Sequence, residues 1–96
     1  MYILGDIGNS ETKVFLVDSN KKIIQNIDFP SKKINNKILN SKFKVLVKDF
    51  KKVKKILFCS VVPKSFSLIK RYLQKKTKLR CYEIKELDLK LLINIK

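Results

Sequence analysis

The sequence predicts an α/β domain built on a mixed sheet of about five strands, in the order βββαβαβ with two main helices. The chain opens with three apolar segments separated by short polar turns, which is typical of an antiparallel meander. Two segments with helical character follow, and a short apolar segment lies between them. Because 96 residues suit one domain, we expect residues 1–96 to form a single domain.

The first three strands are expected at residues 2–7, 12–18 and 21–28. The first two form a hairpin, and the third follows a turn at Ser19-Asn20. Residues 29–31 (Phe-Pro-Ser) end the meander. Residues 32–40 are polar and poorly patterned, so a loop is expected there.

The first helix is expected at roughly residues 42–52, with Ser41 as its N-cap. Its apolar residues recur at helical spacing, which places them on one face: Phe43, Leu46, Val47 and Phe50. Amphipathic helices usually bury this face within their own domain. We therefore expect this face to pack on the sheet. The alternative is that it forms part of a groove for a partner.

A central strand buried on both faces is expected at residues 56–59, because this segment is short and continuously apolar. The second helix begins near Pro63, since proline is tolerated in a first turn, and Ser65 is a candidate to support that turn. It ends at residues 75–76, two lysines suited to a helix C-terminus. Two short strands are expected after it, at residues 81–84 and 91–95.

The net charge of +15 would ordinarily indicate a nucleic-acid partner. All but Arg71 and Arg80 of the 23 basic residues are lysine, however, and alanine is absent. This is the composition that A/T-rich codons produce, and it lacks the arginines that read bases by paired hydrogen bonds. We therefore expect only nonspecific binding to nucleic acids, weakened by salt.

No apolar run approaches the roughly 18 residues of a membrane span, and no signal peptide is evident, so a cytoplasmic protein without a membrane partner is expected. Cys59 and Cys81 are the two cysteines, and histidine is absent. Two structural thiols in a reducing compartment are the simplest interpretation. A disulfide or a metal site is the less favoured alternative.

Residues 6–10 (Asp-Ile-Gly-Asn-Ser) form the turn of the first hairpin and are equipped to bind phosphate. Gly8 lacks a Cβ and tolerates positive φ, so the backbone can approach an anion closely. Asn9, Ser10 and the backbone N–H groups can donate to phosphate oxygens. Lys13 adds a positive charge, and Asp6 can hold a hydrated Mg²⁺. The alternative is an ordinary β-turn, which uses the same residue types.

A second motif, Ser60-Val61-Val62-Pro63, follows the expected central strand and opens the second helix. Together the two motifs resemble those of the type III pantothenate kinases, which belong to the superfamily of acetate kinase, sugar kinases, Hsp70 and actin. An Asp-Ile-Gly-Asn-Thr turn and a later Ser-Val-Val-Pro corner mark that family. The resemblance implies a ribonuclease H-like fold of the actin/Hsp70 ATPase type.

The resemblance also implies a function: ATP-dependent phosphorylation of pantothenate, the first step of coenzyme A biosynthesis, with Mg²⁺ and a monovalent cation such as K⁺. It places Asp6 near the ATP phosphates and their metal. Gly8, Asn9, Ser10 and Lys13 then form the phosphate site, with Ser10 keeping the hydroxyl of the usual threonine. Ser60, Val62 and Pro63 line the cleft, mainly by shaping the corner.

Members of this family are well over twice as long and have two domains, with ATP and pantothenate bound around the cleft between them. Their catalytic base lies in a Gly-x-Asp-Arg segment that corresponds to sequence beyond Lys96, so no catalytic residue is assigned within these 96 residues. We expect no turnover from the chain alone, and a missing C-terminal half or a homodimer mate as partner. The alternatives are a non-catalytic regulatory relative, a truncated product of the family, and a small basic nucleic-acid-binding module.

Overall fold

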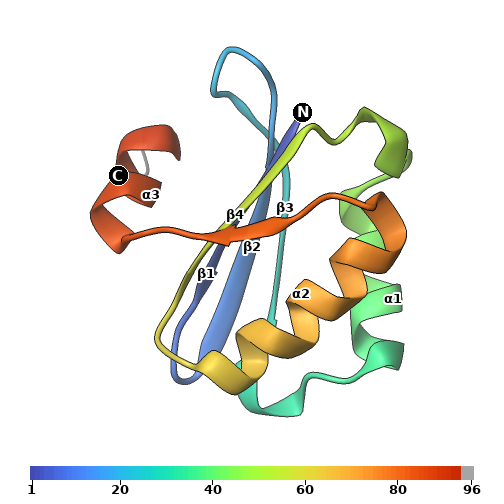
Figure 1. The fold of residues 1–96 in the computed structure, drawn as a ribbon, viewed down its shortest axis with the longest axis vertical. Coiled ribbons are helices and arrows are strands. Elements are labelled where there is room, and N and C mark those ends of the chain that lie inside the picture. The colour runs from blue at the N-terminus through green and yellow to red at the C-terminus, as the bar shows by residue number, and fades with distance from the viewer. Residues whose placement is uncertain (94–96) are drawn as a thin grey trace.

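A computed structural model describes residues 1–93 (Figure 1). Its strands are β1 (Tyr2–Ile7), β2 (Glu11–Val17), β3 (Ile23–Pro30), β4 (Lys55–Ser60) and β5 (Cys81–Glu83). Its α-helices are α1 (Asn36–Leu46), α2 (Pro63–Thr77) and α3 (Glu86–Ile93), and two 3-10 turns are η1 (Ser31–Lys33) and η2 (Phe50–Lys52).

The strands form one mixed sheet in the order β3-β2-β1-β4-β5. β1, β2 and β3 are antiparallel neighbours, whereas β4 runs parallel to β1 and β5 runs parallel to β4. The predicted fold class, an α/β domain on a mixed five-stranded sheet, is confirmed. The expected central strand at residues 56–59 lies within β4, between two parallel neighbours.

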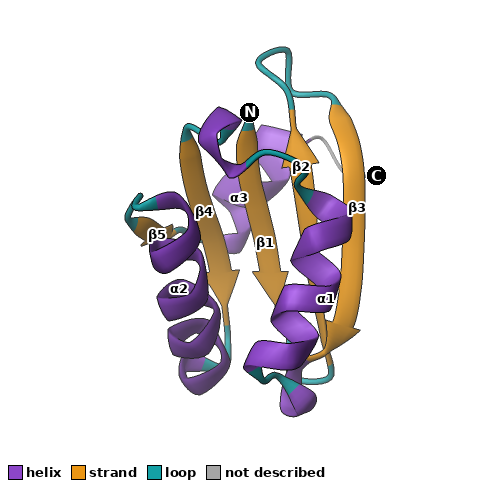
Figure 2. Cartoon of the chain, turned by 90° about the vertical axis from the view of Figure 1, so that its right-hand side faces the viewer, coloured by secondary structure: helices purple, strands orange, loops and turns teal. Residues whose placement is uncertain are grey.

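Helices cover both faces of the sheet. Figure 2 shows α1 and α2 on one face and α3 on the other. Alternate residues of a strand point to opposite faces, so β1 places Ile3 and Ile7 in the core beneath α1 and α2. Leu4 lies in the smaller core on the other face, where Leu89 of α3 packs. The second helix begins at Pro63 and has lysines in its last turn, as predicted.

The first helix differs from the prediction, because it spans Asn36–Leu46 rather than residues 42–52. Asn35 is its N-cap, and the Asn35 side-chain oxygen accepts a hydrogen bond from the Ile38 N–H at 2.9 Å. The predicted N-cap Ser41 lies inside the helix, and the loop expected at 32–40 is wrong over most of its length. Leu39, only 1% exposed, supplies the apolar contact that the polar composition of this segment concealed.

The expected apolar face of this helix does pack on the sheet, although two of its residues lie beyond the helix. Phe43 and Leu46 belong to α1 and are buried. Val47 takes an extended conformation at the C-cap, and Phe50 lies in η2, where the Asp49 carboxylate accepts from the Lys51 N–H. A chain reversal after Leu46 therefore brings the later residues back to the same core.

The last predicted strand, residues 91–95, is wrong within the described residues, and its positions 94 and 95 lie outside them. The chain forms α3 there instead. Leucine favours a helix, and the spacing of Leu89 and Leu92 lets both pack against the sheet from one helix face. The third strand is shifted to Ile23–Pro30, because the Asp18 carboxylate accepts from the Asn20 and Lys22 N–H groups and extends the turn.

Candidate functional site

The two sequence motifs meet at one edge of the sheet. β1 and β4 are parallel neighbours, so their carboxyl ends lie side by side, with Ile7 opposite Ser60. The Val61 N–H donates to the Ile7 carbonyl oxygen at 3.0 Å. In Figure 1 the β1–β2 turn and the β4–α2 connection lie together at the lower end of the sheet. Residues about fifty positions apart in the sequence thus form one continuous edge.

The turn between β1 and β2 is tight, and its tip is open to solvent. The Gly8 N–H donates to the Glu11 carbonyl oxygen at 3.0 Å, and Asn9 and Ser10 are exposed. Gly8 does not have a positive φ, so the positive φ anticipated from the sequence is not used. Its lack of a side chain matters for space, because a Cβ would lie 3.1 Å from the Glu11 oxygen.

Asp6 and Lys13 are directly opposite each other in the β1–β2 ladder, just before and just after the turn. Opposite residues of an antiparallel pair point to the same face. Strand alternation puts both on the face that carries Leu4 and α3. Asp6 is half-buried and Lys13 is exposed, so a carboxylate and an ammonium group flank the base of the turn on one side.

The β4–α2 corner is held by Ser60. Its Oγ accepts from the Val62 N–H at 3.0 Å and donates to the Val62 carbonyl oxygen at the same distance. α2 begins at Pro63 without a side-chain cap. Since unpaired N–H groups and the helix dipole give a helix N-terminus partial positive charge, the start of this 15-residue helix adds to the positive potential at the edge.

Two buried polar residues beside the turn, Thr12 and Ser31, were not predicted from the sequence. Thr12 is fully buried, and its Oγ lies 2.8 Å from Ser31 Oγ. Ser65, which was expected to support the start of α2, instead donates from Oγ to the Ser31 carbonyl oxygen at 3.0 Å. A polar residue at an inward-facing strand position, alternating with Val14 and Leu16, was the available signal for Thr12.

The acidic residues at this edge of the sheet suit a Mg²⁺ site that water and phosphate oxygens complete. Among the side chains that the structure describes, no group of three or more His, Cys, Asp or Glu could hold a metal ion. Mg²⁺ in phosphate-transfer sites is commonly held by one or two carboxylates, together with waters and phosphate oxygens. Asp6 at the base of the turn fits a site of that kind.

Cys59 and Cys81 are both buried, and neither forms a disulfide. Burial raises the pKa of the Cys81 thiol to about 11, and the nearby Lys70 charge opposes this shift. Burial also raises the pKa of Tyr72. Within the described residues, no helix has both the length and the apolar character needed to cross a membrane.

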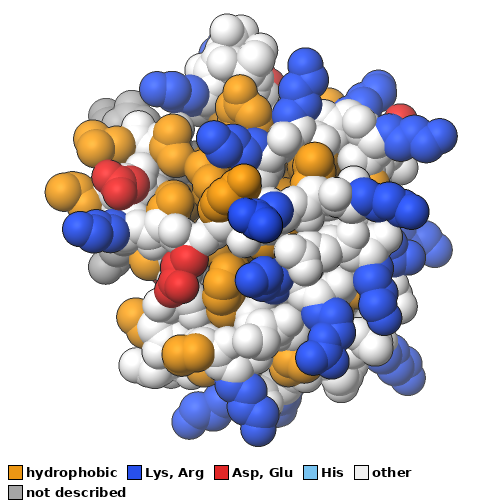
Figure 3. All heavy atoms as spheres, in the orientation of Figure 1, with side chains coloured by type: hydrophobic (Ala, Val, Ile, Leu, Met, Phe, Trp, Pro, Cys, Tyr) orange, Lys and Arg blue, Asp and Glu red, His pale blue; other side chains and the backbone are white. Residues whose placement is uncertain are grey.

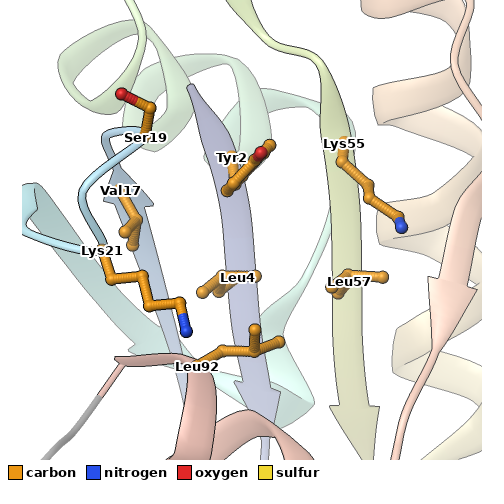
Figure 4. Close-up of a pocket in the computed structure, with 8 residues that line it drawn as sticks. All are labelled: Tyr2, Leu4, Val17, Ser19, Lys21, Lys55, Leu57 and Leu92. Carbon is orange, nitrogen blue, oxygen red and sulfur yellow. The ribbon is translucent and has the colours of Figure 1, made fainter.

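A separate pocket of about 280 Å³ lies at the opposite end of the sheet (Figure 4). Leu4, Leu57 and Leu92 are among its apolar lining residues. In Figure 4 the Lys21 side chain reaches toward Leu92, whereas that of Lys55 extends away. None of the predicted site residues lines this pocket, so it is distinct from the edge where the motifs meet.

The basic side chains do not form one stripe on the face drawn in Figure 3. They are scattered over it, while hydrophobic side chains gather toward the α3 side. Dispersed lysine charge of this kind favours nonspecific attraction of polyanions over a defined nucleic-acid footprint.

Comparison with known proteins gives one consistent result. A family model described as type III pantothenate kinase matches residues 2–96, which include both motifs. The type III pantothenate kinase of Pelagibacter ubique (strain HTCC1062) is 47% identical over 96 residues. That alignment covers 100% of this chain and 39% of the relative, so the chain spans about two fifths of the length of the curated relative that it matches.

Proposed function

The chain belongs to the type III pantothenate kinase family, and from that premise we propose that it supplies the first phosphate-binding loop of a pantothenate kinase. The proposed reaction is the ATP-dependent phosphorylation of pantothenate, the first step of coenzyme A biosynthesis, in the cytoplasm. The observation that carries the proposal is the meeting of the two motifs, through the Val61 N–H and the Ile7 carbonyl, at one sheet edge.

In the proposed site, the residues of the turn hold the phosphates. Gly8 leaves room for close approach of the anion, and Asn9 and Ser10 donate to phosphate oxygens. Lys13 contributes positive charge beside them. Phosphoryl transfer depends mostly on positioning and charge neutralisation, which groups of this kind supply.

Asp6 is the proposed metal residue, because its carboxylate lies at the base of the turn opposite Lys13. Mg²⁺ bound there would neutralise charge on the phosphate oxygens. We also propose a monovalent cation such as K⁺ as a requirement of the family, without assigning residues to it. The Asp6 carboxylate would orient the phosphate-bound Mg²⁺ through its oxygen atoms. Water and phosphate oxygens would fill the other coordination positions of the Mg²⁺.

Ser60, Val62 and Pro63 are proposed to line the cleft rather than to react. The hydrogen bonds between Ser60 and Val62 fix where α2 begins, and the helix N-terminus then faces the same edge as the turn. We propose that residues 1–96 act as one domain of a two-domain site. Further sequence, or a homodimer mate, would supply the opposite wall, the catalytic base and the contacts to pantothenate.

Isothermal calorimetry with ATP–Mg²⁺ tests the phosphate loop. We expect measurable binding by the wild-type chain, about tenfold weaker binding by Asp6→Asn, and no measurable binding by Gly8→Val. Asp18→Asn is the matched control, because it makes the same charge change in the β2–β3 turn, which is joined to the opposite end of β2. Equal weakening by Asp6→Asn and Asp18→Asn would contradict a specific role for Asp6.

A pantothenate phosphorylation assay with K⁺ in the same buffer tests how much of the reaction these residues support. We expect no turnover, because no general base is assigned within the chain. Turnover by the chain alone would contradict the proposed division of roles. A folded chain with neither nucleotide binding nor turnover would contradict the kinase proposal and favour a non-catalytic relative of the family.

A further inference from the structure

The described part of the chain has three buried polar side chains, and all of them belong to one hydrogen-bonded cluster: Thr12, Ser31 and Ser65. We refer to these residues as the Ser31 cluster. Their exposed fractions are 0%, 2% and 5%, so water does not compete for their hydrogen bonds. Thr12 lies in β2 just after the phosphate loop, Ser31 follows β3, and Ser65 is in the first turn of α2.

Ser31 uses all three of its polar groups to join the loop to α2. Its N–H donates to the Ser10 carbonyl oxygen at 3.0 Å. Its Oγ lies 2.8 Å from Thr12 Oγ, with either hydroxyl able to donate. Its carbonyl oxygen accepts from Ser65 Oγ at 3.0 Å. The loop residues on one side and the helix start on the other are therefore fixed to the same residue.

Stability alone does not explain the cluster. Replacing a buried hydrogen-bonded pair by apolar groups of similar shape is often neutral, because the polar groups give up their hydrogen bonds to water on folding. Hydrogen bonds do differ from apolar contacts in direction, and a fully satisfied buried network favours one arrangement. Among the described side chains, no buried nitrogen or oxygen lacks a hydrogen-bond partner, so this network is fully satisfied.

We propose that Ser31 is a positioning residue that holds the phosphate loop at a fixed place relative to the first turn of α2. The inference rests on the proposed function insofar as the loop is the part that binds phosphate. Ser31 would not touch the nucleotide. It would act through Ser10 and Thr12, so that the loop is already in its binding conformation before the ligand arrives.

The test uses the full chain with Thr12→Val, Ser31→Ala and the double variant. Thr12→Ser keeps the hydroxyl and serves as the conservative rescue. Thr77→Val is the control at the other end of α2, where it removes a hydroxyl that donates to the Leu73 carbonyl at 2.7 Å and accepts from the Leu79 N–H at 3.1 Å. Three quantities are measured: the melting temperature, the Kd for ATP–Mg²⁺, and amide hydrogen exchange at positions 8 and 31 without ligand.

Each single variant should lower the melting temperature, because it leaves one buried hydroxyl without its partner. The double variant should recover much of that loss, since both hydroxyls are then absent. The loop amides should nevertheless exchange about three- to tenfold faster in the double variant, and the Kd should rise by a similar factor. Thr12→Ser and Thr77→Val should leave the exchange rates and the Kd close to wild type.

Unchanged exchange at positions 8 and 31 in the double variant would overturn the inference, whatever happens to the melting temperature. Equal effects from Thr77→Val would also overturn it, because a general loosening of the fold would then explain the data. A wild-type chain that does not bind ATP would contradict the proposed function instead. In that case the exchange rates of the ligand-free chain still decide whether Ser31 positions the loop.

Discussion

Gly5 and Phe58 show how one missing side chain determines packing beside the site. They are register neighbours in β1 and β4, and Phe58 is fully buried. A Cβ on Gly5 would overlap the Phe58 ring. The Phe58 ring thus occupies the space that a side chain at position 5 would fill. This position directly precedes Asp6.

Gly5→Ala should lower the free energy of unfolding by about 1–3 kcal/mol, because overpacking forces side chains or backbone to shift. Urea unfolding measures this loss. Phe58→Leu should cost less in the Gly5→Ala background than in the wild type, since a smaller side chain relieves the overlap. Strictly additive effects of the two substitutions would contradict this interpretation of the contact.

Cys81 makes the stability of the fold sensitive to pH in the alkaline range. Burial raises the pKa of its thiol from 9.0 to about 11, so the folded chain keeps the proton longer than the unfolded chain does. The stabilisation is complete below about pH 9 and is lost as the pH rises toward 11. The free energy of unfolding should fall by about 2 kcal/mol over this interval.

The check is urea unfolding of wild type and Cys81→Ala at several pH values between 8 and 11. Cys81→Ala removes the thiol and leaves the other ionisable side chains in place, so the difference between the two curves reports on the thiol. Parallel curves would show that Cys81 does not contribute.

At the residue scale, the sequence identified the turn and the corner, because their residue types are unusual in combination. It could not identify Ser31, since the partners of that residue lie in two distant segments, near residues 10–12 and at Ser65. Of the two properties expected to matter at Gly8, positive φ is not used, whereas the missing Cβ does bear on the turn, because a Cβ would lie 3.1 Å from the Glu11 carbonyl oxygen.

At the scale of elements, helix boundaries were the least predictable feature. The apolar spacing located a helix near Phe43, but not its start. Asn35 caps it six residues before the predicted N-cap Ser41. The last element was predicted as a strand, but it is a helix. The apolar residues 91–93 suit either structure, and only the packing of Leu89 and Leu92 on the sheet distinguishes the two.

Asn35→Ala should lower the free energy of unfolding by about 1 kcal/mol, because the Ile38 N–H loses its acceptor. Ser41→Ala should be neutral or slightly stabilising, since alanine is the better helix former at an exposed interior position. Thermal unfolding of both variants distinguishes a helix capped by Asn35 from one capped by Ser41. A larger loss for Ser41→Ala would place the helix start near residue 42 instead.

At the scale of the whole molecule, the topology explains why two short motifs form one site. Parallel pairing of β1 with β4 is what aligns their carboxyl ends. The continuous apolar character of residues 56–59 predicted a central, buried strand there, but not which strand would be its neighbour. The net charge of +15 does not by itself require a nucleic-acid partner, because nearly all the basic residues are lysines and the chain belongs to the type III pantothenate kinase family. The charge still increases the attraction of any polyphosphate at low salt.

The most direct test of the central claim is amide chemical-shift mapping of the labelled chain with ATP–Mg²⁺ at moderate salt. The largest shifts should fall on Gly8, Asn9 and Ser10 in the turn, with Val61 and Val62 of the corner responding as well. Shifts centred on the pocket near Tyr2 and Lys21, or spread evenly over the lysine-bearing helices, would contradict a phosphate site at this edge of the sheet.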